Sequence, residues 1–470
     1  MNALQKKLRA TEKVGYALGD LSANLVFQTL MTFLAFFYTD VYKIPTATAT
    51  VIISSVGIFA AFVFNPIMGM IADRTDTKMG KFRPWILWTS VPFGIITILM
   101  FTTPNFGEQG KVIYAFITYT LLLVLYAANN LPYAALSGVI TGDMAERNSI
   151  SSYRFVAVMV AQFVVQVLMY PIVDIAGGGD QAIGFEKVMT FLAVIGTIFL
   201  MITFFTTTER IVPKPEQKSS VAQDLTDLFK NKPWIIMLVL TTLVFVTLAL
   251  KGGMYVYYFE NYVSSAHLSP FLEKFSSSQI DNPTTYGFSI FNAGGIIFMI
   301  VGIIFSKGLA DKYGKRDVFG AGLLLSTVFL ILFYFYPPES ILLIFGTQVL
   351  HGFFYGITIP LLWAMIADVA DFSEWKNNRR ATAIIFSAMM IGLKTGLTIG
   401  GSLVTGILGG YGYDPELASQ SASAVSGIKL SISIYAAIPF LIGVALLYFY
   451  EINKKMEVQI ESDLKERRRN

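Results

Sequence analysis

The sequence predicts an all-α membrane protein in which twelve transmembrane helices form two six-helix halves. Its 470 residues are 54% hydrophobic and 14% charged, with a mean hydropathy of +0.60. A soluble domain carries about 25% charged residues. A helix that crosses the lipid core needs about 20 mostly apolar residues, and the chain contains about a dozen such windows separated by short polar segments. No room remains for a separate soluble domain.

The predicted helices fall into two sets of six on either side of a polar break. The break, 209–232, is rich in proline and charged residues, as expected of a cytoplasmic linker, and its end QDLTDLFKNK is compatible with a short surface helix. It separates an N-terminal half, 1–208, from a C-terminal half, 233–450, and leaves 451–470 as a solvated cytoplasmic tail. The helices are expected at 14–41, 46–71, 85–103, 111–138, 151–175, 187–207, 233–262, 286–308, 318–336, 341–371, 382–409 and 428–450.

Lysine and arginine gather in alternate loops. They cluster near the amino terminus, after the second, sixth, eighth and tenth helices, and in the tail, whereas the opposite loops carry single basic residues such as Lys43 and Lys111. Because cytoplasmic loops are enriched in Lys and Arg, both termini are predicted to be cytoplasmic and the polar insert 264–285 periplasmic. The start of the chain is polar and lacks a small-residue cleavage site, so it reads as a cytosolic end and not a signal peptide.

The composition excludes several classes of function. Cysteine is absent and only two histidines occur, so there is no disulfide framework, thiolate nucleophile, or His-rich or Cys-ligated metal site. No Gly-Lys-Ser/Thr phosphate-binding motif appears, and the net charge of +4 gives no support to nucleic-acid binding. We assign no catalytic or metal-ligating residue and expect no cofactor other than a coupling ion.

Two segments recur in corresponding places of the two halves. GMIADRTDTKMGKFRPW follows the second helix and KGLADKYGKRDVF the eighth, while LPYAALSGVITGDMAERNSISSYRF and IPLLWAMIADVADFSEWKNNRRATA follow the fourth and tenth. The alternative is that positive-inside loops alone create part of this likeness. Repeated halves are nevertheless typical of secondary transporters, which bind their solute near the bilayer midplane at the interface of the repeats. A channel would instead show pore-lining rings of carbonyls or like charges.

The fourth helix carries a polar stripe. Tyr126, Asn129, Asn130, Tyr133 and Ser137 share one face of an otherwise apolar helix. Polar groups in a spanning helix face protein or a water-filled cavity, because lipid does not solvate them. The stripe therefore predicts either a cavity wall for a hydroxyl-rich solute or hydrogen bonds between helices.

On the first helix, Asp20, Asn24 and Gln28 share a face. Asp20 is the one carboxylate well inside the first half. It is predicted either to bind a coupling proton or cation, or to brace a cytoplasmic gate with a basic residue.

Two lysines lie within predicted spans of the second half. Lys251 shares a face with Tyr255 on the seventh helix, and Lys394 lies roughly opposite a stripe of glycines on the eleventh. The glycines are expected to let a neighbouring helix approach closely, which turns Lys394 toward the cavity. The alternatives are snorkelling to the interface or a structural ion pair. The glycines are Gly392, Gly396 and Gly400.

Charged residues near the cytoplasmic helix ends are candidates for a gate that latches the two halves. Charges at helix ends are often merely solvated, and that is the alternative. The candidates are Asp73, Arg74, Asp143, Glu146, Asp311, Asp368, Asp371 and Arg379.

Several stretches resemble the glycoside, pentoside and hexuronide cation symporter family of the major facilitator superfamily, to which the melibiose permease belongs. The resemblance covers nearly the whole chain, in family order and spacing. It implies the major facilitator fold and transport of a sugar or sugar acid across the inner membrane of a bacterium. The motifs are GYALGDLSANL, FFYTDVY, NPIMGMIADRTDTKMGKFRPWI, NNLPYAAL, SSYRF, YYFENY, ADVADFSEWK and GLKTGLTIGG.

The resemblance also implies roles for single residues. Asn24 and Asn130 stand where the family has two sugar-contacting acids, and Tyr126 matches the aromatic neighbour of the second acid. Arg154 and Lys394 match basic residues of the fifth and eleventh helices.

The chain departs from the family on the second helix. Ala61 and Asn65 stand where the melibiose permease carries two aspartates of its sodium site. A hard cation is usually held by oxygens that include carboxylates, so sodium coupling is doubtful. Asp20 and Asn65 stay the candidates for proton or cation coupling.

With asparagines in place of the two sugar-contacting acids, the predicted cavity is net basic through Arg154, Lys251 and Lys394. Such a cavity suits a sugar that bears a carboxylate, although a neutral glycoside remains an alternative. The sequence thus predicts a monomeric sugar or sugar-acid symporter in the lipid bilayer, working by alternating access. An uncoupled uniporter is one alternative, and a polytopic membrane enzyme, for which no catalytic constellation stands out, is another.

Overall fold

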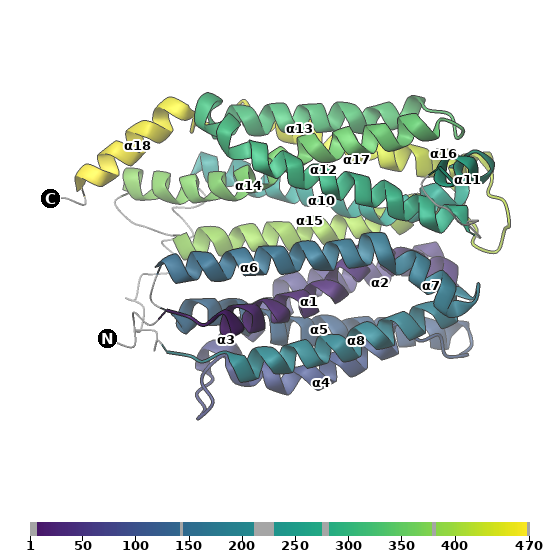
Figure 1. The fold of residues 1–470 in the computed structure, drawn as a ribbon, viewed down its shortest axis with the longest axis horizontal. Helices are drawn as coiled ribbons and strands as arrows, with labels where there is room; N and C mark the ends of the chain where they lie inside the picture. Colours follow the sequence, from purple (N-terminus) through teal and green to yellow (C-terminus); the bar gives the residue numbers. More distant parts are fainter. Residues whose placement is uncertain (1–6, 142–143, 211–229, 275–281, 378–381, 468–470) are drawn as a thin grey trace. The chain divides into compact units, whose positions relative to one another are not determined.

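The regular structure of the chain is helical. The computed structural model describes residues 7–141, 144–210, 230–274, 282–377 and 382–467 (Figure 1), and this part of the chain contains no β-strand. Twelve helices or runs of helices in it are long and apolar enough to cross a membrane, which confirms the predicted number of spans and the all-α fold class.

The spans agree with the predicted ranges to within a few residues at most ends, and the largest differences lie at ends where polar residues continue a helix. They are Ala10–Val41, Thr46–Ala72, Arg83–Met100, Glu108–Ile140, Ser149–Gly177, Gln181–Thr206, Lys232–Asn261, Pro283–Tyr313, Lys315–Phe335, Ile341–Lys376, Ala388–Gly410 and Ala422–Leu447.

Contacts between Cα atoms divide the chain into unit 1, Met1–Glu216, and unit 2, Gln217–Asn470. Most of the expected linker, 209–232, and most of the short helix expected at its end lie outside the described residues. The helices of unit 1 are α1 (Ala10–Phe36), η2 (Phe37–Val41), α2 (Thr46–Phe59), η3 (Ala60–Phe64), α3 (Asn65–Arg74), α4 (Arg83–Met100), α5 (Glu108–Ile140), α6 (Met144–Phe163), η4 (Val164–Leu168), α7 (Met169–Gly177) and α8 (Gln181–Thr206).

Unit 2 repeats this order with two additions, a short helix in the polar insert and one in the tail. Its helices are α10 (Lys232–Asn261), α11 (Ser265–Leu272), α12 (Pro283–Tyr313), α13 (Lys315–Leu332), η5 (Phe333–Phe335), α14 (Ile341–Asn377), α15 (Thr382–Gly410), α16 (Ala422–Leu430), η6 (Ser431–Tyr435), α17 (Ala436–Leu447) and α18 (Lys454–Arg467).

The same helix pairings recur inside each unit. In unit 1, α1 packs against α6 and α8, and α4 packs against α5 and α8. In unit 2, α10 packs against α15 and α17, and α13 packs against α14 and α17, with α12, α13 and α14 side by side (Figure 1). The first span of a unit thus contacts its fifth and sixth, and the third contacts the fourth and sixth, as an internal repeat predicts.

Glycines set the closest helix contacts of unit 2. A side chain at Gly396 or Gly400 of α15 would overlap the carbonyl oxygens of Thr242 and Val246 on α10. Only a residue without Cβ allows that approach. The expectation that the glycine stripe brings a neighbouring helix close is confirmed, and the neighbour is α10.

The loops after the second span of each unit turn in the same way. Gly80 and Gly314 have φ of +112° and +94°, a region that residues with a side chain rarely adopt. In unit 1 the carboxylate of Glu209 accepts hydrogen bonds from the backbone N–H groups of Lys81, Phe82 and Arg83, at 2.7 to 2.9 Å. A carboxylate is favourable there because the N–H groups that open α4 have no helical partner.

In unit 2 the end of α12 is capped by a cation. Lys454 Nζ donates to the carbonyl oxygens of Asp311 and Lys312, both at 2.8 Å. Unpaired carbonyls make a helix C-terminus favourable for a cation. The side chain that follows the last span therefore closes the Gly314 turn, as Glu209 closes the Gly80 turn in unit 1.

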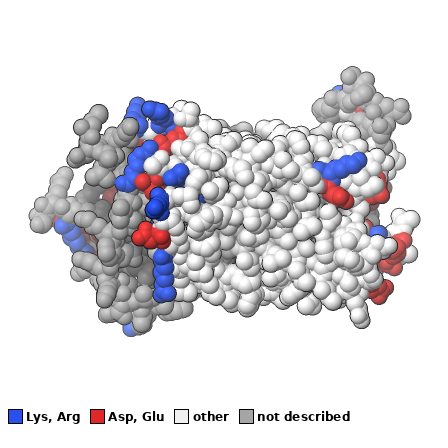
Figure 2. All heavy atoms as spheres, turned by 90° about the horizontal axis from the view of Figure 1, so that it is seen from below, with Lys and Arg blue, Asp and Glu red and all other residues white. Residues whose placement is uncertain are grey.

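Charged side chains lie toward the two ends of the spans. On the face drawn in Figure 2, Lys, Arg, Asp and Glu gather at both ends, and the surface between them is formed by other residues. Exposed apolar side chains such as Ile95, Phe191 and Ile304 lie within spans. This distribution is the one that a lipid environment favours.

The tail contradicts its prediction. Residues 451–470 were expected to be solvated, but Lys454–Arg467 form α18, which packs on α14. Ile452, Ile460 and Leu464 are buried, each 4% exposed. Trp375 Nε1 donates to Asp463 Oδ2 at 2.8 Å. The high charge of the segment hides an apolar pair, Ile460 and Leu464, that is spaced four residues apart.

Candidate functional site

The polar core of unit 1 is an ion pair between the first and fifth spans. Arg154 Nε on α6 donates to Asp20 Oδ2 on α1 at 2.9 Å, and the side chains are 30% and 6% exposed. Asn24 Nδ2 donates to Asp20 Oδ1 at 3.2 Å and to the Asp20 carbonyl at 2.9 Å. Three of the predicted residues therefore meet. Asp20 is thus already held by a basic residue, which is the arrangement that the bracing alternative describes.

Tyr133 belongs to the same cluster but its hydroxyl is already used. It donates to the Tyr16 carbonyl at 2.7 Å, Tyr16 returns the bond to the Tyr133 carbonyl at 2.9 Å, and the two rings stack with centroids 4.6 Å apart. The Arg154 guanidinium lies 5.3 Å from the Tyr133 ring. This reciprocal clamp joins α1 to α5.

The remaining residues of the polar stripe, which lies on α5, divide into two kinds. Asn129 is buried and donates to Thr89 Oγ1 on α4 at 2.7 Å, so it holds helices together. Asn130 is half-buried and makes no hydrogen bond to another described residue. Tyr126 lies against Phe27 and Phe93, with ring centroids 6.1 and 6.3 Å away. Asn130 and Tyr126 remain available to a solute, whereas Asn129 is committed.

The second span contains a π-helical turn, η3, at the position where the resemblance places the two sodium-site aspartates. Ala61 is buried within η3, and Asn65, the first residue of α3, is half-buried. Single π turns often accompany functional sites. Here, though, the two positions supply a methyl group and an amide, and no carboxylate.

In unit 2, Lys251 is buried against a histidine. Its Nζ lies 2.6 Å from His351 Nε2 on α14, and 5.9 and 5.5 Å from the ring centroids of Tyr255 and Tyr355. Two positive charges at that distance would repel by about 6 kcal/mol at an effective dielectric constant near 20. The partner of Lys251 is thus a base, a case that neither predicted alternative covered.

Tyr255 is also engaged inside unit 2. Its hydroxyl donates to Gln348 Oε1 on α14 at 3.2 Å, and its ring packs on Phe291 at 4.9 Å between centroids. Lys394 on α15 differs, because it is half-buried and forms no ion pair with another described residue.

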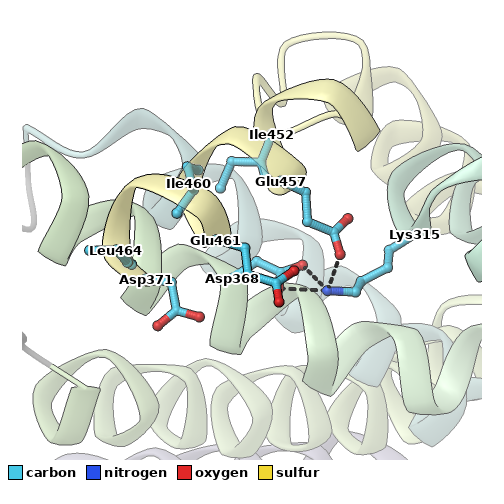
Figure 3. A pocket seen from close by; sticks show the side chains of 8 residues that line it. All are labelled: Lys315, Asp368, Asp371, Ile452, Glu457, Ile460, Glu461 and Leu464. Atoms are coloured by element: carbon cyan, nitrogen blue, oxygen red, sulfur yellow. Dashed lines mark hydrogen bonds and ion pairs between the residues drawn. The ribbon is translucent and has the colours of Figure 1, made fainter. Parts of the chain in front are cut away.

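The predicted gate residues are spread over several environments. Lys315 Nζ contacts Asp368 at 2.7 Å and Glu457 at 2.6 Å, so it joins α13, α14 and α18 (Figure 3). Asp311 is exposed and offers its carbonyl to Lys454, and Arg74 is exposed. Arg379, Asp143 and the side chain of Asp73 lie outside the described residues.

The Lys315 pair borders a pocket of about 310 Å³ under α18. Figure 3 shows Lys315 between Asp368 and Glu457. Tyr450, buried beside this pocket, donates to the Met365 carbonyl at 3.4 Å. Burial raises the pKa of Tyr450 well above its usual range, so it stays neutral and keeps that bond. The pocket is lined by Lys315, Asp368, Asp371, Ile452, Glu457, Ile460, Glu461 and Leu464.

Sequence reasoning missed several charged partners. Arg210 contacts Glu12 with its two terminal guanidinium nitrogens, at 2.6 and 2.9 Å, and Lys13 contacts Glu146 at 2.8 Å. Nothing in the sequence joins these residues, which lie 198 positions apart in the first case. His351 had a local signal, because a histidine within an otherwise apolar spanning segment is a candidate for function.

The family model described as MFS/sugar transport protein matches residues 15–272 and 275–454. The chain is 34% identical over 445 residues to the inner membrane symporter YicJ of Escherichia coli (strain K12), covering 94% of this chain and 92% of that protein. It is 32% identical over 456 residues to the putative glycoside/cation symporter YagG of the same organism, covering 97% and 94%.

A solved structure of a bacterial homologue of the human drug peptide transporters matches with a TM-score of 0.65 at 12% identity, covering 94% of this chain and 98% of that one. This likeness concerns the fold alone. The family match extends over nearly the whole described chain and agrees with the expectation of a transporter and not an enzyme. The chain belongs to the family of MFS/sugar transport proteins and is a multi-pass transporter of the inner membrane.

Proposed function

We propose that the chain is a secondary active symporter that carries a sugar acid, in preference to a neutral glycoside, by alternating access. Family membership supports sugar transport, and the similar protein YagG is named a putative glycoside/cation symporter. The preference for an acid depends on one observation, which is that Lys394 forms no ion pair with another described residue.

Of the three predicted basic residues, Lys394 is the one whose side chain has neither an ion pair nor a hydrogen-bonded partner among the described residues. Arg154 is neutralised by Asp20, and Lys251 contacts His351. Of the three residues predicted to make the cavity basic, Lys394 is therefore the one proposed to pair with the carboxylate of the solute. A carboxylate at about 4 Å would gain a Coulomb energy of about 4 kcal/mol at an effective dielectric constant near 20, before desolvation is subtracted.

Hydroxyl groups of the solute are expected to bind amides. Asn130 has no hydrogen-bond partner among the described residues, and Asn24 keeps acceptor capacity beside its bonds to Asp20. Amides both donate and accept, as sugar hydroxyls do. Tyr126 supplies an aromatic face, which suits the apolar face of a sugar ring.

A proton is the proposed coupling ion. Ala61 and Asn65 place no carboxylate on the second span, so a tight sodium site of the usual oxygen type is not expected there. Sodium gradients should therefore give little stimulation. An uncoupled uniporter would respond to neither gradient.

The test is transport by the purified protein in sealed liposomes. Counterflow of labelled glycosides, pentosides and hexuronides should be saturable without ATP, and uptake should rise with an imposed proton gradient. Absence of counterflow across the whole panel would refute sugar transport, while stimulation by sodium alone would refute the coupling ion.

The same liposomes test the role of Lys394. The parent should bind a hexuronate more tightly than its uncharged counterpart, and Lys394→Gln should remove that preference. Lys307→Gln is the control, because Lys307 is exposed on α12. A preference that survives Lys394→Gln would contradict the assignment.

We further propose cytoplasmic termini and a monomer. The chain has no cysteine, so single cysteines introduced near each terminus can be labelled without background. Membrane-impermeant maleimide should label neither terminus in intact cells and both after permeabilisation. Light scattering of the purified protein checks the monomer.

A further inference from the structure

The deepest ionisable pair of unit 2 is Lys251 with His351, and its hydrogen bonds fix the state of the imidazole. His351 Nδ1 lies 3.0 Å from the Ser326 carbonyl oxygen and 3.0 Å from Ser326 Oγ on α13. A backbone carbonyl only accepts, so Nδ1 carries the hydrogen that donates to it. Nε2 is then left with a lone pair, which accepts from Lys251 Nζ at 2.6 Å.

No carboxylate among the described residues contacts this pair. On its own helices the nearest ionisable groups are the phenols Tyr255 and Tyr355, and Glu260 lies nine positions from Lys251, about 13 Å along α10. The acids of α14, which are Asp368, Asp371 and Glu374, lie near its other end.

Ionisable residues also lie on the helices that pack against α10 and α14. They are Lys394 on α15, Tyr286, Lys307, Asp311, Lys312 and Tyr313 on α12, Lys315, Arg316 and Asp317 on α13, Lys429 on α16, Tyr435 on η6 and His267 on α11. On α18, which packs on the far end of α14, they are Lys454, Lys455, Glu457, Glu461, Asp463, Glu466 and Arg467 together with Lys465. None of those whose side chains the structure describes forms an ion pair with Lys251 or His351. α17 carries no ionisable residue.

We infer that Lys251 and His351 together form the proton-binding site that couples transport, a role for which Asp20 is unsuited because Arg154 holds it. The two side chains together carry at most one positive charge, since an ammonium and an imidazolium cannot lie in contact. Uptake of one proton from water turns a neutral amine and a neutral imidazole into one ammonium hydrogen-bonded to Nε2. Release returns the proton to water, and no bond between heavy atoms changes.

This inference rests on the proposed function, because it names the residues that bind the proton coupled to an anionic solute. A buried positive charge without a carboxylate is costly. A bound anion lowers that cost, and by linkage the protonated pair raises the affinity for the anion to the same degree. Proton and solute therefore favour each other's binding, which is the requirement for symport.

The first experiment separates coupling from transport as such. In liposomes, Lys251→Gln and His351→Gln should lose accumulation driven by a proton gradient, and the pH dependence of uptake should flatten. Counterflow should persist with a weaker apparent affinity for the sugar acid. His267→Gln and Lys307→Gln are matched controls, since both residues are exposed, and should behave as the parent. Proton-driven accumulation equal to the parent in both variants of the pair would overturn the inference.

The outcomes distinguish this inference from the proposed function. A parent without any counterflow would refute sugar transport itself. A parent with counterflow but no response to protons would refute the proton site and leave sugar transport standing. If the variants of the pair do not fold, the response of the parent protein to a proton gradient still tests the inference.

The second experiment needs no change at the site. The chain has two histidines, so ¹⁵N-histidine labelling of His267→Gln leaves His351 as one imidazole signal. We expect the tautomer with hydrogen on Nδ1, and a change of the Nε2 resonance with pH that shifts when a transported sugar acid is added. A resonance that changes neither with pH nor on addition of the sugar acid would overturn the inference that this pair binds the proton.

Discussion

Asp20 and Arg154 join the first and fifth spans of unit 1 through a hydrogen-bonded ion pair of 2.9 Å. Asn24 donates to the same carboxylate, and the stacked rings of Tyr16 and Tyr133 lie beside the guanidinium. The ion pair and the stacked tyrosines therefore hold three helices, α1, α5 and α6, together.

Replacing Asp20 by Asn should lower thermal stability and impair transport under every driving condition, counterflow included. The reason is that Arg154 keeps its charge and loses its partner, which costs about 1–3 kcal/mol in this partly exposed setting. The double variant Asp20→Asn with Arg154→Gln should recover stability. If Asp20→Asn instead kept counterflow and lost only the proton response, Asp20 would be the coupling residue.

Two adjacent asparagines should behave differently. Asn129→Ala should lower the melting temperature, because it leaves Thr89 without the amide at 2.7 Å, a loss of about 1–2 kcal/mol. Asn130→Ala should leave stability unchanged and weaken solute binding about tenfold, which corresponds to about 1.4 kcal/mol. Thermal scanning and equilibrium binding on both variants check this. Equal effects in the two assays would remove the distinction.

A single methyl group should separate α10 from α15. Gly396→Ala places Cβ against the Thr242 carbonyl, so the helices must move apart and stability and transport should both fall. Gly252→Ala is the control, since nothing lies within 4 Å of its added Cβ. The control should be neutral or slightly stabilising, because alanine favours helix by about 1 kcal/mol. Tolerance of Gly396→Ala would show that the contact is loose.

The docking of α18 is tested by two apolar positions of that helix. Ile460 is 4% exposed and Val458 is 60% exposed. Ile460→Ala should release the helix and make it sensitive to protease, because removal of a buried Ile side chain costs about 2 kcal/mol or more. Val458→Ala should leave the digestion pattern unchanged. Identical digestion of both variants would contradict the docked position.

Much of the fold follows from hydropathy. Twelve apolar windows separated by charged loops predicted the spans, because lipid selects for long apolar helices whatever their partners. The glycine stripe of α15 also predicted a close helix contact, although the partner α10 was not identified. By contrast, the π turns of η3 and the docking of α18 depend on tertiary packing that a single sequence does not display.

The candidate site was predictable as a set of residues but not as a set of bonds. Periodicity placed Asp20 and Asn24 on one face, yet the partner Arg154 lies 134 positions away. Likewise Asn129 and Asn130 have the same chemistry in sequence, and only the position of Thr89 on another helix distinguishes them. Lys251 was predicted to face the cavity, with snorkelling or an ion pair as alternatives, and its contact with His351, 100 positions distant, was not predicted.

Glu209 and Lys454 set an order of assembly during synthesis. Each lies just beyond the last span of its unit, and each fastens a loop made far earlier, 127 positions earlier for Phe82 and 143 for Asp311. The loops after the second spans must therefore wait, unfastened, until the sixth or twelfth helix has left the ribosome. Since domains tend to fold as they are completed, each half matures when its final residues arrive. A nascent chain arrested before Glu209 would hold six spans without their closing contact.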